Sequence, residues 1–400
     1  MRTQTELARA LEHAREQTDE LFRLIRPTSL YERPIPERHR IIFYLGHVEA
    51  FDWNLIGRYA LDIRSFHPEF DRLFAFGIDP PPGQLPSDQP SDWPSLAEVE
   101  RYNLRTRDEI DDLLAEVPEQ LCHVAIEHRL MHAETFAYIL HNLAYEQKAA
   151  PPSGPPAATA ARPVQQTIDI PAGAARLGRD PEEGFGWDNE FRAHTVDVRA
   201  FSIARYKVTN GDYLEFVRAG AEAPFFWVER DGRWFCRGMF SETPLPLDCP
   251  VYVTHREAEA FAKWRGKRLP TEPEFHRAAG APPRSGNFGF RHWDPIPVNA
   301  SEGRSNGTSD GTPDNNGRAA GPQQMYGNGW EWTASVFTPF PGFAPFPFYT
   351  NYSEPFFDGD HYVLKGASPR TAACFVRPSF RNWFRPAYPY LYATFRLVES

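Results

Sequence analysis

Apolar residues in the first third of the chain recur at helical spacing. Residues three and four apart share one face of an α-helix, so this pattern predicts amphipathic helices. The recurring positions are Leu7, Leu11, Leu21, Leu24 and Ile25 near the N-terminus and Ile110, Leu113, Leu114 and Val117 further on. We expect four helices in an up-down bundle, near residues 3–26, 37–60, 95–117 and 119–146. The proline-rich segment 78–94 is expected to be a long functional or disordered loop.

The pattern changes after residue 147. Residues 148–163 are mostly Pro, Ala and Thr, which predicts a semi-rigid, extended linker without a core. Beyond the linker, helical spacing appears only at 210–219 and 256–265, each behind a threonine that can cap the helix. Short β-like runs occur at 166–170, 194–198, 201–206, 251–253 and 362–365, and residues 299–323 predict a long surface loop. The expected architecture is therefore a helical bundle (1–147), a linker (148–163) and an α+β domain (164–400).

Composition and charge narrow the class of function. A chain of 400 residues favours two domains, and a formal net charge of -10 argues against binding to nucleic acid or anionic membranes. No apolar run approaches the roughly 18 residues of a membrane helix, and the N-terminus begins a charged helix in place of a signal peptide. The four cysteines (Cys122, Cys236, Cys249 and Cys374) form no C-x-x-C pair. We therefore expect a cytoplasmic protein, with self-association left open.

Three histidines form a candidate metal site. His128 and His132 are four residues apart in the last predicted helix, which places both side chains on one face. His47 lies in an otherwise apolar predicted helix, where an imidazole needs a partner. A bundle can bring the three together, although two histidines at this spacing are often ordinary helix side chains. Three neutral imidazoles suit Zn, Fe, Cu or Ni, and spacing alone does not choose among them.

Four motifs in series carry a resemblance to known proteins. They are Val208–Tyr213 (VTNGDY), Gly266–Phe275 (GKRLPTEPEF), Gly327–Thr333 (GNGWEWT) and Phe395–Leu397 (FRL). This part resembles the formylglycine-generating-enzyme fold, which is a C-type-lectin-like domain, and the helical part with its three histidines resembles the DinB-like bundle. The fusion of the two is similar to the ergothioneine-type sulfoxide synthases, which are non-haem iron enzymes.

The resemblance implies a reaction and a set of site residues. The three histidines would hold Fe(II), which with O2 joins a sulfur donor to C2 of the imidazole of hercynine, and Glu134 would orient a ligating imidazole. Asn382 would bind the carboxylate of hercynine and Trp383 its quaternary ammonium, by cation–π attraction, in a crevice between the domains. Met131 takes a position where relatives often carry a glutamine beside the second histidine.

The chain also departs from these families. Formylglycine generators use a cysteine pair near the C-terminal end of this fold, whereas this region has only Cys374, so formylglycine formation is not expected. Phe384 and Tyr388 replace an Asp and an Arg that handle a γ-glutamylcysteine donor in the well-known sulfoxide synthases. The active-site tyrosine of the family is not placed by sequence; the candidates are Tyr349, Tyr352, Tyr388 and Tyr390, of which we take Tyr388 as catalytic.

The donor residues and the segment 66–80 look more like the selenoneine synthase branch, whose donor is a selenosugar. A neutral sugar does not need the missing charged pair, and Arg72, Asp79 and Arg385 are expected to contact it together with Phe384. The leading hypothesis is thus C–Se bond formation on hercynine. The alternatives are C–S bond formation with cysteine, γ-glutamylcysteine or a thiosugar, a zinc-dependent DinB-type thiol transferase, and a non-enzymatic binding module on a helical scaffold.

Overall fold

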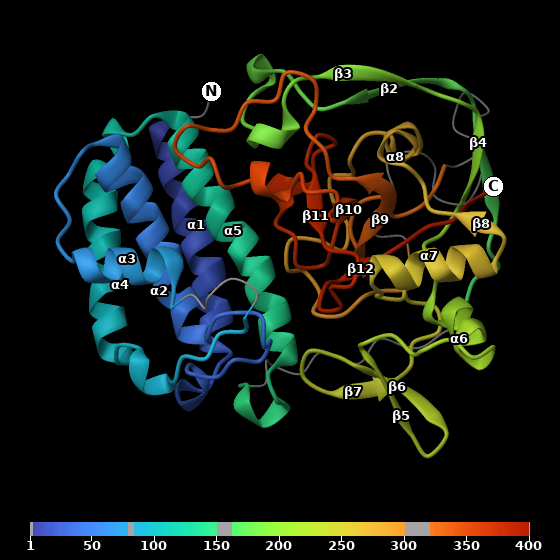
Figure 1. The fold of residues 1–400 in the computed structure, drawn as a ribbon, viewed down its shortest axis with the longest axis horizontal. Helices are drawn as coiled ribbons and strands as arrows, with labels where there is room; N and C mark the ends of the chain where they lie inside the picture. The colour runs from blue at the N-terminus through green and yellow to red at the C-terminus, as the bar shows by residue number, and fades with distance from the viewer. Residues whose placement is uncertain (1–2, 79–83, 150–161, 301–320, 400) are drawn as a thin grey trace. The chain divides into compact units, whose positions relative to one another are not determined.

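The computed structural model describes residues 3–78, 84–149, 162–300 and 321–399. The chain divides into two compact units, Met1–Gly154 and Pro155–Ser400 (Figure 1). The first unit is helical, and the second combines four small sheets with short helices. This agrees with the predicted combination of a helical bundle and an α+β domain. Most of the predicted linker lies outside the described residues, so its extended form stays a prediction.

The four predicted helices are present in the first unit. They are α1 (Gln4–Arg23), α2 (Ile41–Asp52), α4 (Leu96–Leu113) and α5 (Glu119–Asn142), and α2 continues as a π-helical segment, Trp53–Ala60. Helix α1 packs against α5, and α2 packs against both α4 and α5. A capping box starts α1, in which the Thr3 side chain accepts from the Glu6 backbone N–H and the Glu6 carboxylate accepts from that of Thr3.

A further helix, α3 (Pro68–Phe76), was not predicted. It is only nine residues long, with a proline in its first turn, and it begins at His67, whose ring nitrogen accepts from the Phe70 backbone N–H at 3.2 Å. Gly77 ends it with a positive φ of 76°. Its buried Asp71 accepts a hydrogen bond from the Tyr102 hydroxyl of α4 at 2.8 Å. This hydrogen bond connects α3 to α4, and the spacing of apolar residues in the sequence could not predict it.

The segment that follows α3 is also built onto the bundle. Residues 79–83 of the predicted proline-rich loop lie outside the described residues. Beyond them, buried Asp88 accepts from the Trp93 indole N–H at 2.7 Å and from Arg40 Nε at 3.0 Å. The buried Asp88 carboxylate therefore holds residues 84–94, which composition predicted to be a loop, against the helical unit.

Two four-stranded sheets form the centre of the second unit. The first has the order β1 (Thr167–Ile170), β4 (Phe201–Ala204), β13 (Val398–Glu399) and β8 (Lys267–Arg268). The second has the order β11 (Asn382–Phe384), β10 (Tyr362–Ala367), β9 (Gly329–Val336) and β12 (Ala393–Thr394). In the second sheet β12 runs parallel to β9, and the other pairs are antiparallel.

Two smaller sheets and three helices complete this unit. Strand β2 (Gly173–Leu177) pairs with β3 (His194–Val198), and β5 (Trp227–Arg230) pairs with β6 (Arg233–Arg237), which pairs with β7 (Glu242–Pro244). The helices are α6 (Asn210–Arg218), α7 (His255–Trp264) and α8 (Glu272–Ala279). Each begins with a threonine capping box.

The structure corrects two predictions in this unit. Only two helices were expected, but α8 is a third; it is eight residues long, and its capping box Thr271–Glu274 was the available signal. The run 251–253 is not a strand. Its backbone N–H groups form single bonds, from Val251 to the carbonyl of Val208 and from Val253 to the carbonyl of Ala393. Most of the predicted surface loop 299–323 lies outside the described residues.

Buried charges connect the motifs of the second unit. Glu331 of the GNGWEWT motif is fully buried between Trp330 and Trp332, and it pairs with Arg396 of the FRL motif at 3.0 Å and with Lys207 at 2.9 Å. A buried carboxylate without such partners would be strongly destabilising. These motifs therefore hold the core of the fold together.

Candidate functional site

Three histidines converge inside the helical unit. His47 comes from α2, and His128 and His132 come from successive turns of α5. One nitrogen from each ring lies within 4.8 Å of the other two, and the Nε2 atoms of His47 and His132 are 3.1 Å apart. Among the described residues this is the group of three or more potential ligands that could hold a metal ion.

A backbone carbonyl orients the His47 ring. Its Nδ1–H donates to the carbonyl oxygen of Phe74 on α3 at 2.6 Å. Because a carbonyl only accepts, the proton must sit on Nδ1, and the lone pair on Nε2 points toward His132. This is the usual way in which a second hydrogen bond fixes the tautomer of a metal-binding histidine. The partner lies on the helix that the sequence did not predict.

The ring nitrogens are in the protonation state that a metal requires. Burial lowers the pKa of His47 to about 4, and it lowers the pKa of His128 and His132 well below the ordinary value. All three are therefore neutral at pH 7 and can donate a lone pair. Metal–imidazole bonds are about 2.0–2.1 Å long, and the Nε2 atoms of His47 and His132, 3.1 Å apart, are close enough for both to bind one ion. The donor set fits a transition metal.

Aromatic rings surround the histidines. Phe51 stacks on His128 with ring centres 3.4 Å apart, and Phe43 stacks on His47 at 4.8 Å. The ring centres of Tyr44 and His132 are 6.1 Å apart. These rings restrict the imidazoles to one orientation and form an apolar environment around the ligand atoms.

Beside the histidines lies a buried ion-pair network that sequence reasoning missed. Arg129, fully buried, donates to Glu49 at 2.7 Å and to Asp52 at 2.6 Å, and so joins α5 to α2. Burial raises the pKa of Glu49, but the charges of Arg129 and Arg107 outweigh it and bring the pKa to about 2. The available signal was an arginine directly after His128 and two carboxylates flanking the apolar turn after His47. The network fixes the two ligand-bearing helices against each other.

Glu134 and Met131 lie beside the histidines in sequence, and both are half-buried on α5. Successive residues of an α-helix are rotated by about 100°, so the Glu134 side chain leaves α5 about 200° around the axis from that of His132. One orienting contact observed at a ligand is the hydrogen bond from His47 to the Phe74 carbonyl. A role of Glu134 or Met131 in the site stays a prediction.

Asn382 and Trp383 lie on β11 in the second unit. Trp383 is half-buried and stacks on Phe337, with ring centres 4.4 Å apart and planes 5° from parallel. Tyr352 meets it edge-on at 5.2 Å. The side-chain oxygen of Asn382 accepts from the Trp383 backbone N–H at 2.9 Å, which leaves its amide N–H groups as donors. Because Phe337 covers one face of Trp383, at most one face can receive a cation.

The predicted donor residues are placed as follows. Phe384 stacks on Tyr388 with ring centres 5.3 Å apart, and Tyr388 meets Tyr390 edge-on at 5.1 Å. Arg385 is exposed and lies 4.0 Å from Asp360, and Arg72 is exposed on α3. Asp79 lies outside the described residues. Their roles in substrate binding, and that of Tyr388 in catalysis, stay predictions.

Two other tyrosine candidates lie against Trp187. Tyr349 and Tyr352 pack on Trp187, with ring centres 6.3 and 4.1 Å away. Burial raises the pKa of Tyr349 to about 12. At neutral pH this phenol is therefore protonated, as a proton donor must be.

Comparisons with known proteins cover both units. The family described as DinB superfamily matches residues 10–158, and the Sulfatase-modifying factor enzyme 1-like domain matches residues 153–400. The chain is 35% identical over 355 residues to the protein named hercynine oxygenase of Mycobacterium tuberculosis, covering 76% of this chain and 78% of that protein. It is 28% identical over 431 residues to ergothioneine biosynthesis protein 1 of Schizosaccharomyces pombe, covering 94% of this chain and 54% of that protein.

A third relative matches only the second unit. The formylglycine-generating enzyme of Mycobacterium tuberculosis is 28% identical over 237 residues, which cover 44% of this chain and 76% of that protein. None of the helices in the described part of the chain is long and apolar enough to cross a membrane.

Proposed function

We propose that this chain, which belongs to the hercynine oxygenase family, is a non-haem iron(II) enzyme that uses O2 to form a carbon–selenium bond at C2 of the hercynine imidazole. The observation that carries the proposal is the convergence of three neutral imidazoles within 4.8 Å of one another. They would occupy three positions around an ion and leave others for substrates. A second candidate is C–S bond formation, which the names of the relatives favour.

The resemblance to the sulfoxide synthases favours iron, and the chemistry requires a redox-active metal. His47, His128 and His132 would hold the ion, with the His47 ring fixed by its bond to the Phe74 carbonyl. Bound Fe(II) would supply the electrons that activate O2 for attack at an unreactive C–H bond, which redox-inert zinc cannot do. The aromatic rings of Phe43 and Phe51 would limit the access of water to the ion.

Hercynine would be held by Asn382 and Trp383. The amide N–H groups of Asn382 can donate to its carboxylate, and the face of Trp383 opposite Phe337 can attract the trimethylammonium group. Stacking on Phe337 supports this role because it keeps the Trp383 ring in one orientation before the ligand arrives.

The selenosugar donor is inferred from the polarity of the Phe384–Tyr388 pair. Two stacked aromatic rings stand where the resemblance has an Asp and an Arg. A carboxylate of a peptide thiol that is buried without a cationic partner costs several kcal/mol. A neutral sugar avoids this cost, so the pair favours a sugar over γ-glutamylcysteine.

The decisive experiment is anaerobic reconstitution with Fe(II), followed by O2 and hercynine with the selenosugar and γ-glutamylcysteine in competition, read by mass spectrometry. We expect the selenium product to dominate and to require both iron and O2. A dominant sulfoxide product would support the C–S alternative. Turnover with zinc in the absence of O2 would overturn the oxygenase proposal in favour of a thiol transferase.

A gain-of-function variant tests the donor pair directly. Phe384→Asp combined with Tyr388→Arg restores the charged pair of the sulfoxide synthases, and we expect it to increase the use of γ-glutamylcysteine relative to the selenosugar. The matched control is Phe384→Leu combined with Tyr388→Leu, which removes the stack without adding charge. An equal donor ratio in the two double variants would argue against a role of this pair in donor selection.

A further inference from the structure

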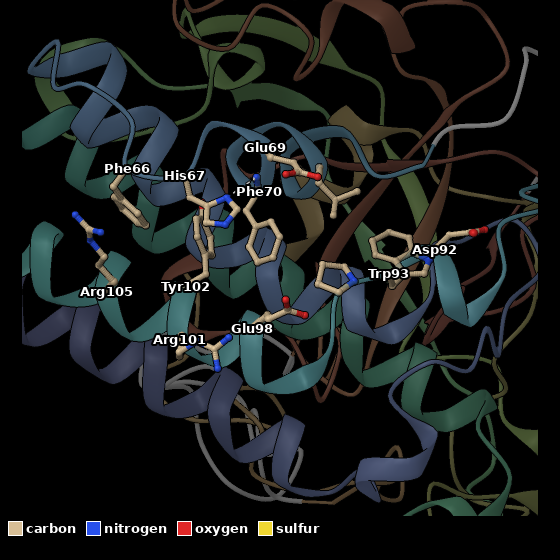
Figure 2. Close-up of a pocket in the computed structure, with 12 residues that line it drawn as sticks. Phe66, His67, Glu69, Phe70, Asp92, Trp93, Glu98, Arg101, Tyr102 and Arg105 are labelled. Atoms are coloured by element: carbon tan, nitrogen blue, oxygen red, sulfur yellow. Dashed lines mark hydrogen bonds between the residues drawn. The ribbon is translucent and has the colours of Figure 1, made fainter.

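A cavity of about 560 Å³ in the helical unit is separate from the three histidines (Figure 2). Its lining consists of residues 92–94, of Phe66 and His67, of Glu69, Phe70 and Leu73 on α3, and of Glu98, Arg101, Tyr102 and Arg105 on α4. None of the three histidines lines it. Its volume lies within the range typical of small-molecule sites.

Aromatic rings form the floor of this cavity. Phe70 and Tyr102 are buried with ring centres 5.5 Å apart, and Phe66 lies 5.5 Å from Tyr102 on the other side. Trp93 is buried at the far end, with its indole N–H bound to Asp88. The floor thus offers ring surface, which favours an apolar or weakly hydrated cationic group.

One donor group projects from the floor. The His67 ring lies 4.0 Å from that of Phe70, and its Nδ1 accepts from the Phe70 backbone N–H. Because Nδ1 accepts, a neutral His67 carries its proton on Nε2. That N–H has no hydrogen-bond partner among the described residues and can donate to an anionic ligand.

Charges of both signs stand at the rim. Figure 2 shows Glu69 and Arg101 on opposite sides of the His67 and Phe70 rings. Both are exposed, and neither makes a hydrogen bond or an ion pair with another described residue. Glu98, near Arg101, is engaged in capping α4 at Ser95. The rim therefore presents the Glu69 carboxylate and the Arg101 guanidinium across an aromatic floor, and the charge of Arg101 also attracts the nearby Glu98.

We propose that this cavity binds a small zwitterion that carries a carboxylate and a quaternary ammonium group. The carboxylate would pair with Arg101 and accept from the His67 Nε2–H, since guanidinium and imidazole N–H groups are strong partners for carboxylates. The ammonium would lie on the rings of Phe70 and Trp93 within reach of Glu69. A primary ammonium is more strongly hydrated, so the aromatic floor selects for methylated nitrogen.

The site would be a second one, distinct from the proposed substrate residues Asn382 and Trp383. Hercynine belongs to the same chemical class, and only its use as a natural ligand here rests on the proposed function. The ligand would contact α3 at Phe70, one turn before Phe74, whose carbonyl orients His47. Occupancy of the cavity should therefore stabilise the helix that positions a metal ligand.

The test uses glycine betaine as the probe, with the full chain, because it is a trimethylated zwitterion without an imidazole and is not turned over. Binding is measured by calorimetry, and its location by hydrogen–deuterium exchange of peptides covering residues 66–76 and 92–105. We expect glycine betaine to slow exchange in both segments. Arg101→Gln and Glu69→Gln should each weaken binding at least tenfold and abolish the slowing.

Glu100→Gln and Arg64→Gln are matched controls, since both residues are exposed in the same unit but do not line the cavity. They should bind glycine betaine as the unaltered chain does. No slowing of exchange in these segments, or unchanged affinity in Arg101→Gln, would overturn the proposal. Because glycine betaine is not a substrate, failure of hercynine turnover would leave this result standing, and intact turnover without betaine binding would overturn the cavity site alone.

Discussion

At the scale of single residues, the three histidines differ in how they are supported. His47 is fixed by a hydrogen bond to Phe74, whereas His128 is fixed by the stacked ring of Phe51. Spacing on α5 predicted the pair His128 and His132, because i and i+4 always share a helix face. The orientation of His47 was not predictable, because its partner is a backbone carbonyl on a short helix distant in sequence.

We predict that replacing any one of the three histidines by alanine lowers bound Fe(II) sharply. Loss of a mere supporting contact reduces metal affinity by about 10–100-fold, and loss of a ligand should reduce it at least as much. The measurement is iron content and affinity after anaerobic reconstitution. The control is His13→Ala on the exposed face of α1, which should keep its iron. Undiminished iron in all three variants would contradict the metal site.

Trp383→Ala should weaken the binding of hercynine more than that of histidine. A cation–π contact contributes about 0.5–2 kcal/mol, or roughly 2–30-fold in affinity, and histidine lacks the quaternary ammonium. Calorimetric titration of both ligands measures the difference. Trp264→Ala is the control, since Trp264 is exposed on α7 at 41% and should change neither affinity. Equal losses for the two ligands would rule out a cation–π role.

At the scale of elements, the contact between α2 and α5 depends on Arg129. We predict that Arg129→Met lowers the free energy of unfolding of the helical unit by about 3–5 kcal/mol, because Glu49 and Asp52 stay buried without their main partner. Chemical denaturation followed by far-UV circular dichroism measures this. Arg105→Met removes an exposed pair with Glu109 and should cost only about 0–1 kcal/mol. Similar losses in both variants would show that the network is not stabilising.

Element length decides which helices the sequence predicts. Helices α1, α2, α4 and α5 contain 12 to 24 residues, long enough for apolar residues to repeat over several turns. Helices α3 and α8 contain nine and eight residues, so only their caps identify them. His67 is an unusual cap, whereas Thr271 with Glu274 is a common one that was present but not used. The consequence is functional, since α3 carries the carbonyl that orients His47.

At the scale of the whole molecule, the sequence predicts architecture better than residue roles. Glu331 and Arg396 lie 65 residues apart, yet both belong to recognised motifs because they form one buried pair. Such motifs identify a fold by its core. The stack of Phe384 on Tyr388, in contrast, replaces two charged residues of the family pattern. The sequence shows that the charged pair is missing, but it does not show which contact the new residues make.

Buried titratable groups of the second unit set its response to acid. Burial lowers the pKa of His255 to about 4 and that of His276 to about 3, so both must take up protons on unfolding below their ordinary pKa of 6.5. The contribution of these two histidines to stability is therefore fully present above about pH 6.5, and it is lost as the pH falls from there toward their folded-state pKa values. Each histidine should reduce the free energy of unfolding by about 2 kcal/mol between pH 7 and pH 5.

Asp188 changes the pH dependence of stability in the opposite direction to the two histidines. Burial raises its pKa to about 6, so the folded state holds a proton that the unfolded state releases above pH 3.8, and acid stabilises the fold through this group. We predict that Asp188→Asn steepens the loss of stability between pH 7 and pH 5 by about 1 kcal/mol, because the two histidines then act without this offset. Denaturation of the full chain at both pH values measures the difference. Asp197→Asn on the exposed side of β3 is the control and should leave the pH dependence unchanged; an identical slope in both variants would mean that Asp188 is ionised in the folded protein throughout this range.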